Sequence, residues 1–178
     1  LSDIDSDAGE LRVQGFLIEE IAENSTYEEA AWLLLNGRLP TDSELNEFTD
    51  ELSSARSLPE NVHSLIQTGA EEDVPAIDVL RLGLGAGCLY FDTEDTLMST
   101  RRVVAMCPTI IAAYWRYRQE LEPIQPSKNL DHTANFLYML SGEEPAKSNV
   151  ERLETYLTTI IEHGLNASTF AARIIGST

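Results

Sequence analysis

Residues 98–118 form the longest segment with a helical period, and apolar side chains occupy almost every face of it. A helix that is apolar nearly all round is stable only when other elements cover most of its sides. The sequence therefore predicts a fold in which several helices surround this segment. Pro108 lies inside it and predicts a kink or break near residues 105–107, because proline has no amide hydrogen and its ring crowds the preceding turn.

Most of the remaining chain divides into short amphipathic segments with recognisable ends. Ser25 or Thr26 is a suitable N-cap for a helix that Gly37 ends, and Thr41 with Glu44 three residues later forms a capping-box pattern. Only residues 1–15 suit a short β-hairpin. About eight or nine helices and almost no strand make this an all-α fold. The other predicted helices lie at 16–22, 59–69, 76–90, 132–140 and 148–163.

Three glycines, Gly83, Gly85 and Gly87, alternate within the apolar segment 76–90. Alternating glycines can belong to a phosphate-binding loop, but no strand precedes these and no Lys-Ser/Thr pair follows them. Close packing of this helix against a neighbour is the better interpretation, because glycine lets two backbones approach each other.

The charge of the chain limits what it can bind. It carries 30 acidic and 12 basic residues, a net charge of −18, so nucleic acid is not an expected partner. At about 1 M salt the Debye length falls to roughly 3 Å, which screens repulsion among the carboxylates. We therefore hypothesise a cytoplasm of high ionic strength, as in a halophile. The alternative is an ordinary acidic protein.

The length of 178 residues and a hydrophobic fraction of 43% are typical of a globular protein, with one compact unit as the default. No apolar run approaches the roughly 20 residues of a membrane span, and the first residues lack the pattern of a signal peptide. We expect a soluble, cytoplasmic protein with no membrane partner. No two histidines have the spacing of metal ligands, so no metal site is expected.

The final sixteen residues bring together a histidine, an amide and a guanidinium group. On a continuous helix, His163, Asn166 and Phe170 would share one face, and Arg173 would flank it. Such side chains can donate hydrogen bonds to the oxygens of a small di- or tricarboxylate. The alternative is a histidine satisfied within the core.

The segment Glu162–Phe170, with the sequence EHGLNASTF, resembles a signature of citrate synthases and the related 2-methylcitrate synthases. Five earlier segments resemble the same family in the expected order, so the resemblance extends over nearly the whole chain. They are residues 9–15 (GELRVQG), 33–41 (LLLNGRLPT), 78–81 (DVLR), 108–118 (PTI followed by RYR) and 135–140 (NFLYML).

The resemblance implies an all-helical homodimeric acyltransferase that condenses oxaloacetate with acetyl-CoA, the acetyl-CoA being a substrate and no further cofactor being required. It implies that His163 binds the oxaloacetate carboxylate, with Asn166 and Arg173 as possible support. The family's second histidine, third histidine and catalytic aspartate match nothing in residues 1–178, so no catalytic residue is expected in this chain.

The same resemblance assigns residues 1–178 to the N-terminal part of the family's large helical domain, without the small CoA-binding domain or the C-terminal helices. Two alternatives stay open. One is a 2-methylcitrate synthase, because the choice of acyl chain depends on a pocket outside these residues. The other is a non-catalytic, half-length helical dimerisation module.

Overall fold

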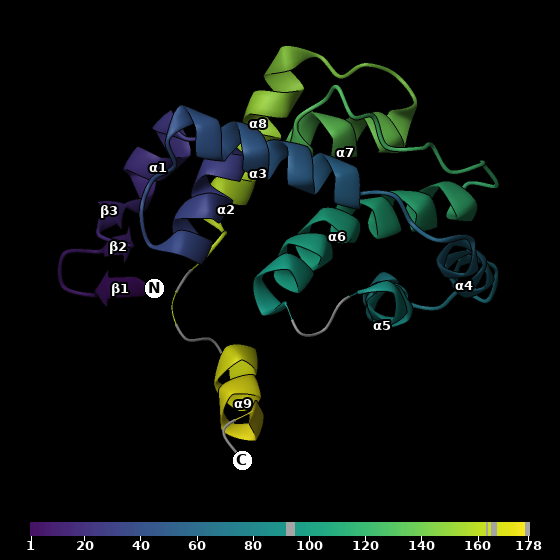
Figure 1. Ribbon diagram of the computed structural model, residues 1–178, viewed down its shortest axis with the longest axis horizontal. Helices are drawn as coiled ribbons and strands as arrows, with labels where there is room; N and C mark the ends of the chain where they lie inside the picture. Colours follow the sequence, from purple (N-terminus) through teal and green to yellow (C-terminus); the bar gives the residue numbers. More distant parts are fainter. Residues whose placement is uncertain (92–94, 163, 165–166, 177–178) are drawn as a thin grey trace. The chain divides into compact units, whose positions relative to one another are not determined.

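The structure is a computed structural model that describes residues 1–91, 95–162, 164 and 167–176, with only the backbone of residue 173. Within these residues it contains nine α-helices, one short 3-10 helix and a small three-stranded sheet, which confirms the predicted all-α class (Figure 1). Contacts divide the chain into two compact units rather than the single unit favoured by its length. Unit 1 comprises Leu1–Leu45 and Glu151–Thr178, and unit 2 comprises Asn46–Val150.

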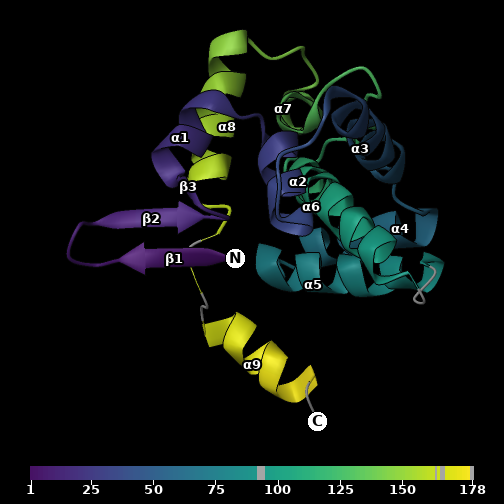
Figure 2. The ribbon, with the colours of Figure 1, turned by 60° about the vertical axis from the view of Figure 1, so that its left-hand side comes forward.

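Unit 1 begins with the small sheet, which contains β1 (Ser2–Asp5), β2 (Glu10–Val13) and β3 (Phe16–Leu17). The strands are antiparallel in the order β1-β2-β3, and Figure 2 shows β1 and β2 side by side. The predicted hairpin is confirmed. The predicted helix at 16–22 begins later, because Gly15 (φ 90°) reverses the chain and the next two residues pair with β2. Helix α1 (Ile18–Asn24) follows.

The next helix, α2 (Tyr27–Asn36), begins after Thr26, one of the two N-caps predicted, and ends at the predicted Gly37. The Thr26 hydroxyl accepts a hydrogen bond from the Glu29 amide at 3.2 Å, and the Glu29 carboxylate accepts one from the Thr26 amide at 2.7 Å. Gly37 ends the helix with φ 74°, a conformation that favours glycine. The core of unit 1 forms where α1, α2 and β2 meet, and its buried members are Val13, Ile18, Ile21, Ala30 and Leu33.

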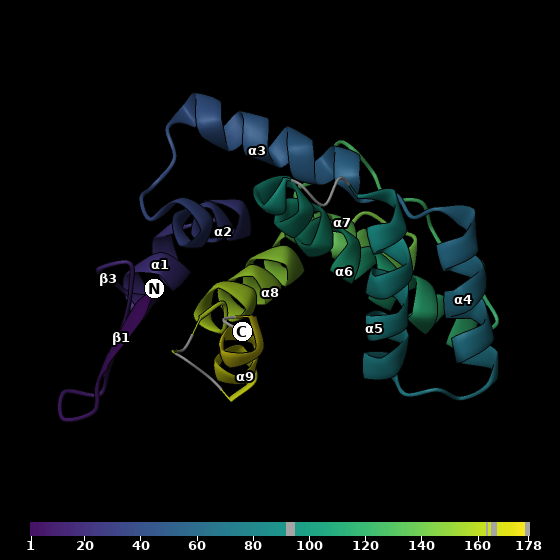
Figure 3. The ribbon, with the colours of Figure 1, turned by 60° about the horizontal axis from the view of Figure 1, so that its bottom comes forward.

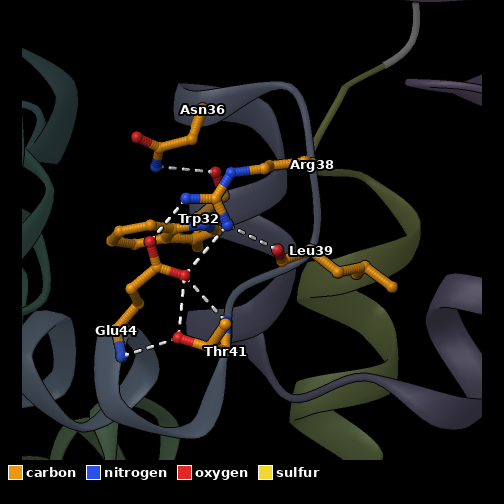
Figure 4. A network of polar contacts seen from close by, with 6 residues as sticks. All are labelled: Trp32, Asn36, Arg38, Leu39, Thr41 and Glu44. Carbon is orange, nitrogen blue, oxygen red and sulfur yellow. Dashed lines mark hydrogen bonds and ion pairs between the residues drawn. The ribbon is translucent and has the colours of Figure 1, made fainter.

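A polar network fixes the loop between α2 and α3 (Asp42–Ala55), as Figure 4 shows. The predicted capping box is present, since the Thr41 amide donates to Glu44 Oε2 at 2.9 Å and the Glu44 amide donates to Thr41 Oγ1 at 3.4 Å. Arg38 binds both carboxylate oxygens of Glu44, and its guanidinium carbon lies 5.9 Å from the centre of the Trp32 ring. Hydrogen bonds from Arg38, and then from Thr41, lower the pKa of Glu44 to about 2.

This network predicts an acid-sensitive contribution to stability. A carboxylate whose folded pKa is depressed stabilises the fold above its unfolded pKa, here 4.5, and loses that contribution as the pH falls toward the folded value of about 2. We expect Glu44→Gln to lower the unfolding midpoint at pH 6 but to differ little from the parent protein near pH 2. Urea titrations across this pH range would check it, and a difference that does not change with pH would contradict it.

Unit 2 is built around α6 (Thr96–Arg118), which packs against α4 (Glu60–Glu71), α5 (Ala76–Gly87) and α7 (His132–Ser141). Figure 3 shows α4 and α5 side by side. The short 3-10 helix η1 (Cys88–Tyr90) follows α5. The segment predicted to be surrounded by helices is thus covered from several sides. The buried core of this unit comprises Val62, Ile66, Val79, Met106, Ile110 and Ala113.

The close packing predicted for the glycines of α5 is confirmed at two of the three positions. A Cβ atom on Gly83 would lie 3.1 Å from Ile110 Cδ1, and one on Gly87 would overlap the end of Met106. Gly85 is different, since a Cβ atom there would meet nothing within 4 Å. Only the face of α5 that is turned toward α6 therefore requires glycine for packing.

Helix α6 runs through Pro108 without ending, so the predicted break does not occur. An internal proline costs about 3 kcal/mol, mainly through one lost backbone hydrogen bond and crowding in the preceding turn. Buried residues on both sides, including Met106 (3% exposed) and Ile110 (0% exposed), outweigh that cost, because burying one such side chain contributes about 1.5–3 kcal/mol.

Candidate functional site

The residues predicted to bind a carboxylate lie at the C-terminal end of unit 1. His163 and Asn166 fall outside the residues that the structure describes, and Arg173 lies in α9 (Ala167–Gly176) with only its backbone described. The predicted clamp of these three side chains therefore stays a prediction. What the structure does describe is how the chain is held on both sides of residue 163.

The continuous helix expected through this segment is wrong. Helix α8 (Lys147–Thr159) ends four residues before residue 163, and α9 begins only at Ala167. Gly164 has φ +96°, a left-handed conformation that interrupts helical geometry and favours glycine. No continuous helix thus leads from α8 into α9, and Phe170 is 55% exposed in α9.

The end of α8 is fixed to the rest of unit 1 before residue 163 is reached. Glu154 of α8 accepts a hydrogen bond from the amide of Tyr27, the first residue of α2, at 3.1 Å. Thr158 is fully buried and donates to the carbonyl of Glu154 at 2.9 Å. Ile161 then packs against the buried core cluster of unit 1. The main chain that leads to residue 163 is therefore held in place by contacts within unit 1.

Glu162 connects the segment to strand β1. Its Oε1 accepts one hydrogen bond from the Gly164 amide at 2.7 Å and another from the Ser2 hydroxyl at 3.2 Å. A Cβ atom on Gly164 would lie 3.3 Å from Ile4 Cδ1 of the same strand. The backbone on both sides of residue 163 is thus tied to β1. Sequence reasoning missed this contact, because Ser2 and Glu162 are 160 positions apart and no local pattern connects them.

The surroundings of the other two histidines, His132 and His63, do not suit the binding of a carboxylate. His132 is the first residue of α7 and 5% exposed, and burial, followed by the charge of Arg56, lowers its pKa to about 3. Burial also lowers the pKa of His63, against a smaller opposing effect of Glu60. Both imidazoles are therefore disfavoured as cations, which makes them poor ligands for a carboxylate.

One shallow groove of about 250 Å³ lies between α1 and α8 in unit 1, lined by Ile18, Glu19, Ala22, Glu23, Thr155 and Thr159. Its only charged side chains are two carboxylates, which would repel an anionic substrate. The groove is thus a poor site for a dicarboxylate.

Among the residues that the structure describes, no group of three or more His, Cys, Asp or Glu side chains is arranged to hold a metal ion. No helix among them combines the length and apolar character needed to cross a membrane.

The comparisons with known proteins indicate one and the same family. The model described as "Citrate synthase, C-terminal domain" matches residues 1–178. The chain is 40% identical to a citrate synthase from Haloferax volcanii, covering 100% of this chain and 49% of that protein. It is 34% identical to a citrate/2-methylcitrate synthase from Bacillus subtilis, over 100% of this chain and 49% of the relative.

A solved structure extends the comparison to the fold. The crystal structure of citrate synthase from Pyrobaculum aerophilum superimposes with a TM-score of 0.92 at 33% identity, over 99% of this chain and 47% of that one. The chain thus spans about half the length of the relatives it matches.

Proposed function

The chain belongs to the citrate synthase family, and on that premise we propose that the protein condenses oxaloacetate with acetyl-CoA to give citrate and free CoA. The observation that carries the proposal is the match over all of residues 1–178, together with 40% identity to a protein named citrate synthase. The reaction would be the entry step of the citric acid cycle, catalysed by an acyltransferase that uses acetyl-CoA as substrate and needs no other cofactor.

Within this proposal, His163 binds a carboxylate of oxaloacetate, and Asn166 and Arg173 support it. A dicarboxylate must be held by fixed hydrogen-bond donors so that its carbonyl group is presented for attack in one orientation. Donors are particularly necessary in a chain with a net charge of −18, whose overall field repels anions. The family's remaining catalytic groups, two histidines and an aspartate, would come from outside residues 1–178.

The direct test is an assay of CoA release by the full-length polypeptide with oxaloacetate and acetyl-CoA. We expect turnover that requires both substrates. A folded protein that binds oxaloacetate in calorimetry but releases no CoA would contradict the proposed reaction. A folded protein that binds no oxaloacetate would instead favour a helical dimerisation module without catalysis.

A second activity, 2-methylcitrate synthesis, is favoured by the similarity to the Bacillus subtilis citrate/2-methylcitrate synthase. The two differ by one methylene group in the acyl substrate, which is worth only about 1–3 kcal/mol of discrimination in an apolar pocket. The ratio of kcat/KM for acetyl-CoA and propionyl-CoA would separate them. A larger value for propionyl-CoA would make 2-methylcitrate synthase the better name.

The acidic composition supports the further proposal of a halophilic, cytoplasmic protein that binds no nucleic acid or membrane. At low salt the 18 uncompensated negative charges repel one another, and about 1 M KCl shortens the Debye length to roughly 3 Å. We expect the thermal unfolding midpoint to rise from low to molar KCl. Equal stability at both concentrations would identify an ordinary acidic protein.

We also propose a homodimer in which α5 of two subunits meet. The outer face of α5 and the following 3-10 helix expose large apolar side chains, namely Ile77 (62%), Leu82 (46%), Leu89 (79%) and Tyr90 (55%). Exposed apolar surface of this kind is typical of a face that a partner covers. Gly85 lies among these residues, and a Cβ atom built there would meet no atom of the described residues of its own subunit within 4 Å.

This arrangement predicts that Gly85→Phe will convert dimer to monomer. A Cβ atom at position 85 meets nothing within 4 Å among the described residues of its own subunit, whereas a phenyl ring there would overlap a second helix packed over Gly85. Light scattering coupled to gel filtration would give the mass. Glu47→Phe places the same side chain on an exposed position of α3 and should leave the mass unchanged. An unaltered dimer in Gly85→Phe would exclude this face.

A further inference from the structure

We propose that Glu162 and Ser2 are positioning residues for oxaloacetate binding, with Ser2 acting through Glu162. This inference rests on the proposed role of His163 and adds to it. Neither residue needs to touch the substrate. The role we infer is to fix the main chain on both sides of residue 163, so that the imidazole is presented from a defined backbone.

The first support is the geometry of the Glu162 carboxylate. A single oxygen, Oε1, accepts from the Gly164 amide at 2.7 Å and from the Ser2 hydroxyl at 3.2 Å. The first bond joins the residues on either side of position 163, and the second joins Glu162 to β1.

The second support is that Ser2 belongs to a strand that is itself fixed. Ser2 pairs with Val13 in the antiparallel register, and Val13 is 1% exposed in the core of unit 1. The Gln14 amide also donates to the Leu1 carbonyl at 2.8 Å, beyond the end of the strand. The Ser2 hydroxyl therefore holds Glu162 against the sheet. The preceding residue, Ile161, packs against the core of the same unit.

The third support is the fit of Gly164 to β1. Its φ of +96° is strained for any residue with a side chain, and a Cβ atom would come within 3.3 Å of Ile4 Cδ1. The chain thus leaves position 163 through a conformation and a space that both favour glycine. Glu162 and Gly164 therefore both lie against strand β1.

The charge of Glu162 gives the fourth argument. A carboxylate next to a residue that binds a dicarboxylate weakens the attraction for that substrate. A neutral side chain would avoid this repulsion, so the useful property of Glu162 is its ability to accept two hydrogen bonds at once. Glutamine has the same length and a carbonyl oxygen that can accept both bonds. Glu162→Gln and Glu162→Ala therefore separate the acceptor from the charge.

The experiment measures KM for oxaloacetate and for acetyl-CoA, and kcat, in the full-length protein. We expect Glu162→Ala to raise the oxaloacetate KM about tenfold while the acetyl-CoA KM changes little, because small displacements of a binding group are costly. Ser2→Ala should raise the oxaloacetate KM by a smaller factor. The double variant should resemble Glu162→Ala alone, since Ser2 acts through Glu162. Glu162→Gln should have an oxaloacetate KM at or below that of the parent.

Controls separate positioning from general damage and from failure of the proposed reaction. Glu144→Ala removes an exposed carboxylate in unit 2 and should leave both KM values unchanged. An unchanged oxaloacetate KM in folded Glu162→Ala overturns the positioning role while the parent protein remains active. Equal damage in the Gln and Ala variants also overturns it. If Glu162→Ala does not fold, the oxaloacetate KM of Ser2→Ala tests the positioning role instead, and an unchanged value overturns it. An inactive parent protein would remove both the proposed reaction and this inference.

Discussion

Replacing His163 by alanine is expected to raise the KM for oxaloacetate by about tenfold or more. A hydrogen bond from histidine to a carboxylate is charge-assisted, and such bonds contribute about 1.5–3 kcal/mol, which corresponds to roughly 10- to 100-fold in binding. The acetyl-CoA KM should change much less, because the proposed contact is with the other substrate. Steady-state kinetics of the full-length protein, with each substrate varied in turn, would measure both effects.

The fold should survive this substitution, which makes the result interpretable. Three features hold the chain without the side chain of residue 163: Ile161 packs against the core of unit 1, the Glu162 carboxylate accepts two hydrogen bonds, and Gly164 is bound to Glu162. His63→Ala is a suitable control, because His63 lies in α4 of unit 2 and has no proposed role in binding. An unchanged oxaloacetate KM in His163→Ala, with an unchanged unfolding midpoint, would defeat the assignment.

Local signals explain which parts of the fold could be predicted. Thr26, Gly37 and the Thr41–Glu44 pair act within a few residues of their own positions, so their patterns can be read along the chain. The apolar segment around Ile110 likewise predicts burial from its own composition. In each of these cases the physical cause lies inside the segment that shows the pattern.

Interactions between distant segments explain what could not be predicted. Pro108 signals the end of a helix locally, but packing on both sides keeps α6 continuous. Residues 148–163 have helical periodicity, yet α8 ends at Thr159 and the chain turns where Glu162 meets Ser2. A single sequence does not show such a pairing over 160 positions. The anchoring of the main chain around residue 163 could therefore not be predicted from the sequence, and the site itself stays a prediction.

Arg56 is the clearest example of a residue whose role depends on distant segments, and its replacement has the largest expected effect on stability. It stands directly after the end of α3 and looks like an ordinary surface arginine in the sequence. In unit 2 it is 0% exposed, and its Nη1 donates to the carbonyls of Ser127 at 3.1 Å and Leu130 at 2.7 Å. One guanidinium group thus holds the connector that leads from α6 to α7.

We expect Arg56→Ala to reduce the free energy of unfolding by about 3–5 kcal/mol. The change leaves two partly buried carbonyl groups without this donor, at about 1 kcal/mol or more each, and it empties the volume of a large, fully buried side chain. Urea titration followed by circular dichroism would measure the loss.

Arg81→Ala is the matched control for this substitution. Arg81 pairs with Asp78 on the surface of α5, where its side chain is 76% exposed, and an exposed pair of this kind contributes less than about 1 kcal/mol. Arg56→Lys should recover part of the loss, because lysine keeps the charge and its donors but not the planar shape of the guanidinium group. If Arg56→Ala cost no more than Arg81→Ala, the connector would be held by its other contacts. One of these is the bond from the Ser127 amide to Asn135 Oδ1 at 2.7 Å.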